Sequence, residues 1–119
     1  MLTKSNPKGY QEKLKGIMQK TLSYGEKTLL THIKLSKGST IPIHNHIHEQ
    51  TGFLISGQME FTINGELFNA EPGDSWTILK NIPHGAFVVK DSIVIEVFSP
   101  VREDYLPRNE IFVKDDIGI

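Results

Sequence analysis

The chain has 119 residues, a formal charge of -1 and no cysteine. This length fits one domain, over residues 1–119, and allows a hydrophobic core without disulfide bonds. The absence of cysteine excludes a thiolate metal site and a cysteine nucleophile. Thirteen basic and fourteen acidic residues, with no long run of either sign, argue against nucleic acid as a partner. No apolar run resembles a signal peptide or a membrane span, so we expect a soluble cytoplasmic protein with no membrane partner.

Glycine and proline recur at short intervals, with Gly52 and Gly57 among these turn signals. The segments between them are rich in β-branched and aromatic residues, which is typical of an all-β barrel or sandwich. Residues 12–20 fit either a short helix or an edge strand. The predicted strands follow in chain order: residues 27–35, 51–55, 58–63, 75–79, 86–89 and 92–98. Residues 103–119 are charged and irregular, and we expect a tail that lies over the barrel or is exchanged with a partner subunit.

Alternation within these strands predicts which side chains face the core. The inward sets are Leu29, Ile33 and Leu35 in the first strand, and Met59, Phe61 and Ile63 in the third. His32 lies on the opposite face, so we interpret it as a surface or interface histidine. Phe53 and Ile55 point away from Gln50, towards a second layer or a partner subunit. Asn64-Gly65 predicts a tight hairpin turn.

Three of the five histidines lie within residues 44–48, in the segment IPIHNHIHEQ. On a strand His44 and His46 project from the same face, so both imidazoles can reach one ion. Ile41 and Ile43 would form a second buried face, and buried imidazoles without partners are costly. We therefore favour metal ligation over a purely structural role for these histidines.

A further histidine follows a proline downstream. Pro83 fixes the direction in which His84 leaves its turn. By itself His84 would be an ordinary loop histidine.

Together these stretches resemble the cupin superfamily. The first cupin motif reads Gly38-x5-His44-x-His46-x3-Gln50-x6-Gly57, and the second is built from Pro72, Gly73 and His84. The match covers about residues 27–98. The resemblance implies a double-stranded β-helix, or jelly-roll barrel, with one divalent metal held in its mouth by the three histidines.

The fourth ligand and the metal are less determined. The resemblance places Gln50 where many cupins have glutamate, and His48 and Glu49 are nearby alternatives. A neutral amide leaves the full charge on the ion, which strengthens its action as a Lewis acid. Imidazole suits nickel, zinc, iron and copper, and manganese also belongs among the candidates.

A second group of residues lies at the end of the last strand. Glu96 interrupts an apolar run, and a buried carboxylate needs a partner or a proton. Phe98 shares its face, and Arg102 follows closely enough to turn back. The simpler interpretation is a structural Glu96–Arg102 pair. The functional interpretation is a pocket wall. Glu96 would be an acid/base, Phe98 an aromatic platform, and the planar guanidinium of Arg102 would bind a carboxylate.

This segment resembles small pectin degradation proteins, which linearise unsaturated monouronates. Their acid-x-Phe-x-x-x-Arg pattern has aspartate where Glu96 stands, so the acid here is one methylene longer. The resemblance implies a homodimer and a small-molecule ligand, an unsaturated uronate, with Arg102 on its carboxylate and Glu96 moving the proton. An iron-dependent dioxygenase and a non-catalytic binding cupin remain alternatives.

Overall fold

The computed structural model describes residues 1–107, and nearly all of its regular structure is β-strand. The strands are β1 (Gln11–Leu14), β2 (Ile17–Tyr24), β3 (Leu29–Leu35), β4 (Thr40–His44), β5 (Glu49–Ile63), β6 (Glu66–Ala70), β7 (Ser75–Ile78) and β8 (His84–Ser99). One short 3₁₀ helix, η1 (Glu103–Tyr105), follows them. The expected all-β class is confirmed. The predicted tail beyond residue 107 lies outside the described residues.

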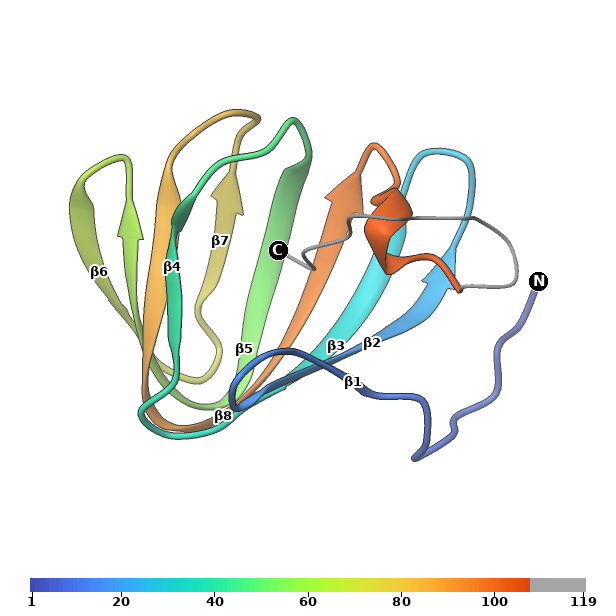
Figure 1. Cartoon of the computed structure of the whole chain (residues 1–119), viewed down its shortest axis with the longest axis horizontal. Helices are drawn as coiled ribbons and strands as arrows, with labels where there is room; N and C mark the ends of the chain where they lie inside the picture. Colours follow the sequence, from blue (N-terminus) through green and yellow to red (C-terminus); the bar gives the residue numbers. More distant parts are fainter. Residues whose placement is uncertain (108–119) are drawn as a thin grey trace.

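All pairings are antiparallel, and two long strands organise them. The order is β1-β2-β3-β8-β5-β6, with β4 also paired to β8 and β7 to β5. The first part of β5 lies between β7 and the end of β8, whereas its second part lies between β6 and the start of β8. Each long strand therefore contributes to both halves of the barrel. Figure 1 shows the two arms of β8 rising from one bend.

The bends in β5 and β8 correct the predicted strand boundaries. Residues 51–55 and 58–63 belong to one strand, as do residues 86–89 and 92–98. Gly57 has φ +97°, and a Cβ there would lie 2.2 Å from Ser92 Oγ, so glycine permits the close approach of the two strands. The ladder shifts register around Gly57, which identifies a bulge rather than a turn. Gly52, also predicted as a turn signal, lies inside β5.

The predicted core face is largely confirmed. Leu29, Ile33, Leu35, Met59 and Phe61 are buried, and Ile63 is partly buried against the same cluster. The structure also decides between the two interpretations of residues 12–20. They form strands β1 and β2 around a turn at Gly16, so the helix interpretation is wrong.

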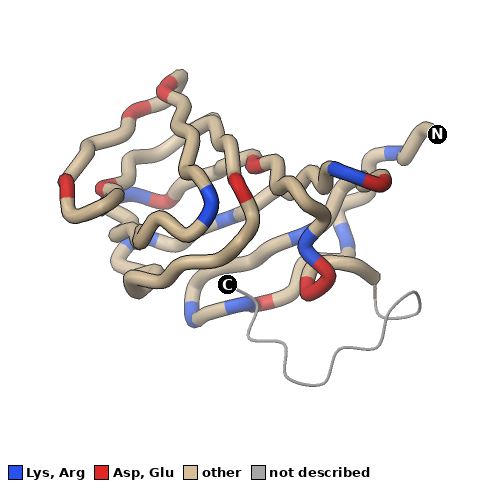
Figure 2. The backbone as a smooth tube through the Cα atoms, turned by 90° about the horizontal axis from the view of Figure 1, so that it is seen from above, with Lys and Arg blue, Asp and Glu red and all other residues tan. Residues whose placement is uncertain are grey.

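Outward-facing residues follow the sequence prediction in part. His32 lies on the face away from the core, and its ring nitrogen is 2.9 Å from the Tyr10 hydroxyl. Phe53 and Ile55 are 40% and 44% exposed, as expected for residues opposite Gln50. Figure 2 shows lysine, arginine, aspartate and glutamate distributed along the described residues rather than gathered in one place. Within residues 1–107 no helix is long and apolar enough to cross a membrane.

Candidate metal centre and its pocket

Three histidines from two parts of the chain converge near one end of the barrel. His44 ends β4, His46 follows it in the loop, and His84 begins β8. One ligand atom from each lies within 4.8 Å of the others. The ring centroids of His44 and His84 are 4.3 Å apart, and those of His46 and His84 are 4.9 Å apart. The three imidazoles could therefore hold one metal ion.

The local reason for this arrangement differs from the one that alternation suggests. Ile43 is 59% exposed, so the expected second buried face at Ile41 and Ile43 is wrong. The β4–β8 ladder shifts register between Ile41 and His44, and both of these residues line the same pocket. A bulge changes which residues share a face, so it turns His44 inward without burying Ile43.

Backbone carbonyls hold each imidazole through its Nδ1 atom. Nδ1 of His44 lies 2.8 Å from the carbonyl of Pro42, and Nδ1 of His84 lies 2.8 Å from that of Ile82. Nδ1 of His46 lies 2.9 Å from the carbonyl of His48. Because a carbonyl only accepts, the proton must sit on Nδ1. The Nε2 lone pair of each ring is therefore the one directed at a metal.

Burial leaves two of these nitrogens without partners among residues 1–107. Nε2 of His46 and Nε2 of His84 are buried and have no hydrogen-bond partner there. Burial also lowers the pKa of all three histidines, and for His46 burial, helped by the Arg102 charge, lowers the pKa to about 4. Neutral imidazoles with unused lone pairs are what a divalent transition metal requires. The residues present therefore fit such an ion.

Gln50 and the alternatives for a fourth ligand occupy different environments. Gln50 is buried in β5 and lines the pocket with His44 and His84, while Glu49 is exposed. The Gln50 amide Nε2 donates a 2.7 Å hydrogen bond to Glu96 Oε2, which leaves its carbonyl oxygen directed away from Glu96. The His48 imidazole is partly buried, and its Nδ1 has no hydrogen-bond partner among residues 1–107, so His48 stays an alternative to Gln50. Burial and orientation thus favour Gln50 over Glu49.

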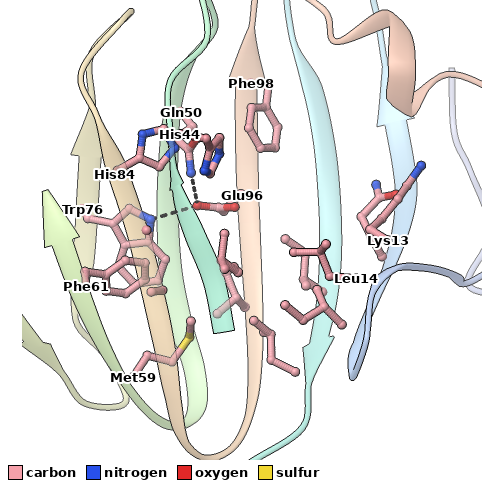
Figure 3. Close-up of a pocket in the computed structure, with 18 of the residues that line it drawn as sticks. Lys13, Leu14, His44, Gln50, Met59, Phe61, Trp76, His84, Glu96 and Phe98 are labelled. Carbon is pink, nitrogen blue, oxygen red and sulfur yellow. Dashed lines mark hydrogen bonds between the residues drawn. The ribbon is translucent and has the colours of Figure 1, made fainter. Parts of the chain in front are cut away.

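Glu96 has partners other than the one expected. Its Oε2 accepts hydrogen bonds from Gln50 and from the indole Nε1 of Trp76, the latter at 2.9 Å. Figure 3 shows both bonds reaching the same oxygen, with the other oxygen pointing away towards the opposite wall. Burial raises the pKa of Glu96, an effect that these two hydrogen bonds and Arg102 oppose. Trp76 was absent from the sequence-predicted site, although the buried acid already implied a donor.

Arg102 makes a carboxylate contact, but with Asp104. Its Nη2 and Nε atoms lie 2.6 and 3.1 Å from the two Asp104 oxygens, and its Nη1 donates to the Tyr105 hydroxyl. The guanidinium carbon lies 5.0 Å from the Phe98 ring centroid and 4.1 Å from that of Tyr105. The predicted neighbours Phe98 and Arg102 therefore do come together on the pocket wall.

One pocket joins these groups. It is lined by His44, Gln50, His84, Glu96, Phe98 and Arg102, together with apolar residues below them. Figure 3 shows His44, His84, Gln50 and Trp76 gathered around Glu96, above Met59 and Phe61, with Lys13 on the opposite side of the pocket. The cavity combines two of the three clustered histidines, a buried carboxyl group and a cation, which suits binding of an anionic small molecule.

The fold and site together define a small antiparallel β-barrel with a histidine triad near its open end. The family model described as a cupin domain matches residues 31–99, more than half of the chain. The chain therefore belongs to the cupin family. This confirms the resemblance seen in the two histidine motifs, and the match boundaries lie close to those of the motif-bearing region.

Comparisons with individual proteins show which cupins the chain is similar to. The chain is 31% identical over 93 residues to the pectin degradation protein KdgF of Dickeya dadantii (strain 3937), covering 76% of this chain and 84% of that protein. The structure of KdgF from Halomonas sp. matches with a TM-score of 0.83 at 29% identity, covering 89% of this chain and 98% of that one. An RmlC-like cupin from Shewanella frigidimarina NCIMB 400 matches with a TM-score of 0.80 at 25% identity, covering 84% and 90%. The KdgF-like subgroup is thus supported by both sequence and structure.

Proposed function

We propose that this chain is a metal-dependent enzyme that opens and ketonises a small carboxylate-bearing sugar derivative, an unsaturated uronate. The observation that carries the proposal is the convergence of three imidazoles, each held at Nδ1 by a backbone carbonyl, beside a buried carboxyl group and an arginine. The likeness to the KdgF proteins supports the uronate as substrate class.

The proposed ligands are Nε2 of His44, His46 and His84, with the carbonyl oxygen of Gln50 as the fourth. Nickel, zinc, iron, manganese or copper would supply Lewis acidity towards substrate oxygen atoms at this position. A ligand set of three neutral imidazoles and a neutral amide would leave open positions on an ion that takes five or six ligands, as a catalytic site requires.

The surrounding residues supply binding and proton transfer. Arg102 places positive charge near the histidines, since it contributes to lowering the pKa of each of them. Its fork binds the Asp104 carboxylate in two places, and a uronate carboxylate would have to displace Asp104 to bind in the same geometry. Phe98 lies against it as an apolar wall for the sugar ring. Glu96 would hold and move the proton at Oε1, because Oε2 accepts the bonds from Trp76 and Gln50.

The metal proposal is tested by elemental analysis of the isolated protein and of His44→Ala and Gln50→Ala. We expect about one metal per chain in the parent and strongly reduced metal in His44→Ala. Full occupancy in both variants would contradict the ligand assignment.

The activity is tested by following the ultraviolet absorbance of unsaturated galacturonate. Metal-loaded protein should accelerate its loss above the spontaneous rate, and Arg102→Met and Glu96→Gln should each reduce the acceleration. If the loaded parent protein shows no acceleration, the uronate proposal is abandoned. Fe(II)-dependent oxygen uptake would instead favour the dioxygenase, whereas bound metal without either activity would favour a binding cupin.

We also propose that the protein is a homodimer. Phe53 and Ile55 form an exposed apolar pair on the outer face of β5, opposite the pocket. A second copy that packs on this face would remove the pair from water. Sedimentation equilibrium distinguishes a dimer of this 13.4 kDa chain from a monomer.

A further inference from the structure

A row of three residues crosses neighbouring strands beneath the histidines. Gly52 of β5 is paired with Trp76 of β7 on one side and with Glu96 of β8 on the other. Trp76 and Glu96 thus lie two strands apart, about 9–10 Å by the usual strand spacing. A direct hydrogen bond over that distance requires a long side chain. It also requires that the residue on the strand between them leave space for that side chain.

Gly52 provides that open position. A Cβ on Gly52 would lie 2.3 Å from two atoms of the Trp76 indole, Cε2 and Nε1. The indole therefore lies directly on the backbone of β5, and only glycine leaves room for it. From there Trp76 Nε1 reaches Glu96 Oε2 at 2.9 Å. Phe61 packs against the indole, with ring centroids 4.4 Å apart, and holds the ring in place.

The hydrogen-bond chain continues to Gln50. An indole N–H can only donate, so Glu96 Oε2 is an acceptor in this contact. The Gln50 atom 2.7 Å from the same oxygen is the donor Nε2. The two ends of an amide are a donor and an acceptor that point in different directions. Fixing Nε2 on Glu96 therefore turns the Gln50 carbonyl oxygen away from Glu96, and Figure 3 shows His44 and His84 clustered with Gln50 on that side.

We propose that Trp76, seated on Gly52, is a positioning residue that fixes the Glu96 carboxylate and, through it, turns the Gln50 carbonyl towards the three histidines. This rests on the metal site proposed above. It assigns to Trp76 and Gly52 a role in metal binding although neither offers a ligand atom. Without the indole N–H, a protonated Glu96 carboxyl group can rotate and turn its O–H towards Gln50, and the Gln50 carbonyl oxygen can then face Glu96 instead of the histidines.

The first test is Trp76→Phe, which keeps an aromatic ring on Gly52 and removes the N–H. Outer groups that orient ligands typically change metal affinity 10–100-fold, so we expect Co²⁺ affinity to fall by at least about 10-fold. The visible absorption of bound Co²⁺ should also change. Val88→Ala is the packing control, since it opens the apolar core away from the pocket without removing a hydrogen-bonding side chain, and it should keep both the affinity and the spectrum.

A double-mutant cycle separates positioning from general loosening of the barrel. If Trp76 acts through Gln50, Trp76→Phe should cost little Co²⁺ affinity in a Gln50→Ala background. Gly52→Ala, which keeps the indole but displaces it, should resemble Trp76→Phe. An undiminished effect of Trp76→Phe in the Gln50→Ala background would overturn the proposal, as would a parent-like affinity and spectrum in Trp76→Phe itself.

A second measurement requires no metal. In ¹⁵N spectra of the metal-free protein, the Gln50 side-chain NH₂ signals, assigned by their loss in Gln50→Ala, should be protected from solvent exchange. Trp76→Phe should remove that protection, and its persistence would refute the chain of hydrogen bonds. A parent protein that binds no Co²⁺ but shows the expected NMR change would contradict the proposed metal site while leaving the positioning of Gln50 supported.

Discussion

Replacing His84 by leucine tests whether this histidine stabilises the barrel itself or is needed only to bind the proposed metal. His84 makes one hydrogen bond through Nδ1, to the Ile82 carbonyl, while its buried Nε2 has no partner among residues 1–107. Losing the hydrogen bond costs about 1 kcal/mol, and removing a buried unpaired nitrogen returns about 1–3 kcal/mol. We therefore expect metal-free His84→Leu to be as stable as the parent or up to about 2 kcal/mol more stable.

The metal reverses this comparison. At a free Zn²⁺ concentration 100 times the dissociation constant, a single site stabilises the folded state by about 2.7 kcal/mol. For a domain of this size that raises the melting temperature by on the order of 10 °C. His84→Leu should lose this increase because one of three converging imidazoles is gone. The expected result is a variant that matches or exceeds the parent in chelator and falls below it in Zn²⁺.

Urea unfolding in chelator and in excess Zn²⁺ measures both effects. His32→Leu is the matched control, because this histidine bonds Tyr10 on the outer face and should keep the full Zn²⁺-induced increase. Two results would refute the reasoning. One is a metal-free His84→Leu protein destabilised by more than about 2 kcal/mol, which would make the imidazole structural. The other is a Zn²⁺-induced increase that survives the substitution.

Three other changes test separate parts of the structure. Gly57→Ala should lower the free energy of unfolding by about 3 kcal/mol in urea titrations, because the position has φ +97° and the added Cβ would meet Ser92 Oγ; a loss below about 1 kcal/mol would contradict the tight bulge. Arg102→Lys keeps the charge but loses the planar fork, so KM for the uronate should rise about 10-fold with kcat little changed; an unchanged KM would remove Arg102 as the carboxylate anchor. Phe53→Asp should yield a folded monomer by sedimentation, and a persistent dimer would place the interface elsewhere.

Much of the fold follows from local pattern in the sequence. Period-two alternation in residues 27–35 and 58–63 identified buried side chains such as Leu29 and Phe61, because strand geometry alone decides which face they occupy. The spacing of His44 and His46 likewise indicated that both can reach one ion, whereas His84 joined them only through the resemblance to the cupins. What alternation could not locate were the bulges. A bulge changes the face of every residue beyond it, which is why Ile43 is exposed although its parity predicted burial.

The partner of Glu96 illustrates the same limit over a longer range. An acid in an apolar strand signalled that a buried partner must exist, and the nearest candidate in the sequence was Arg102. The donors are instead Trp76 and Gln50, which lie 20 and 46 residues earlier in the chain. They meet Glu96 only because β5 bends at Gly57 and brings its first part between β7 and β8. That register is a property of the assembled sheet, and no local pattern contains it.

The bends also explain how one small barrel can hold so many groups that lower its stability. Because β5 and β8 each cross from one face to the other, their buried positions fall in two zones. Leu54, Met59, Val88 and Val94 pack in the apolar core, whereas Gln50 and Glu96 lie near the ends of the same strands, beside the histidines. Unpaired imidazole nitrogens and a buried carboxyl group lower the free energy of unfolding through local desolvation, and they do not disturb the packing of the apolar zone. Substitutions around the proposed metal site should therefore change metal binding while leaving the apolar zone, and with it the fold, intact.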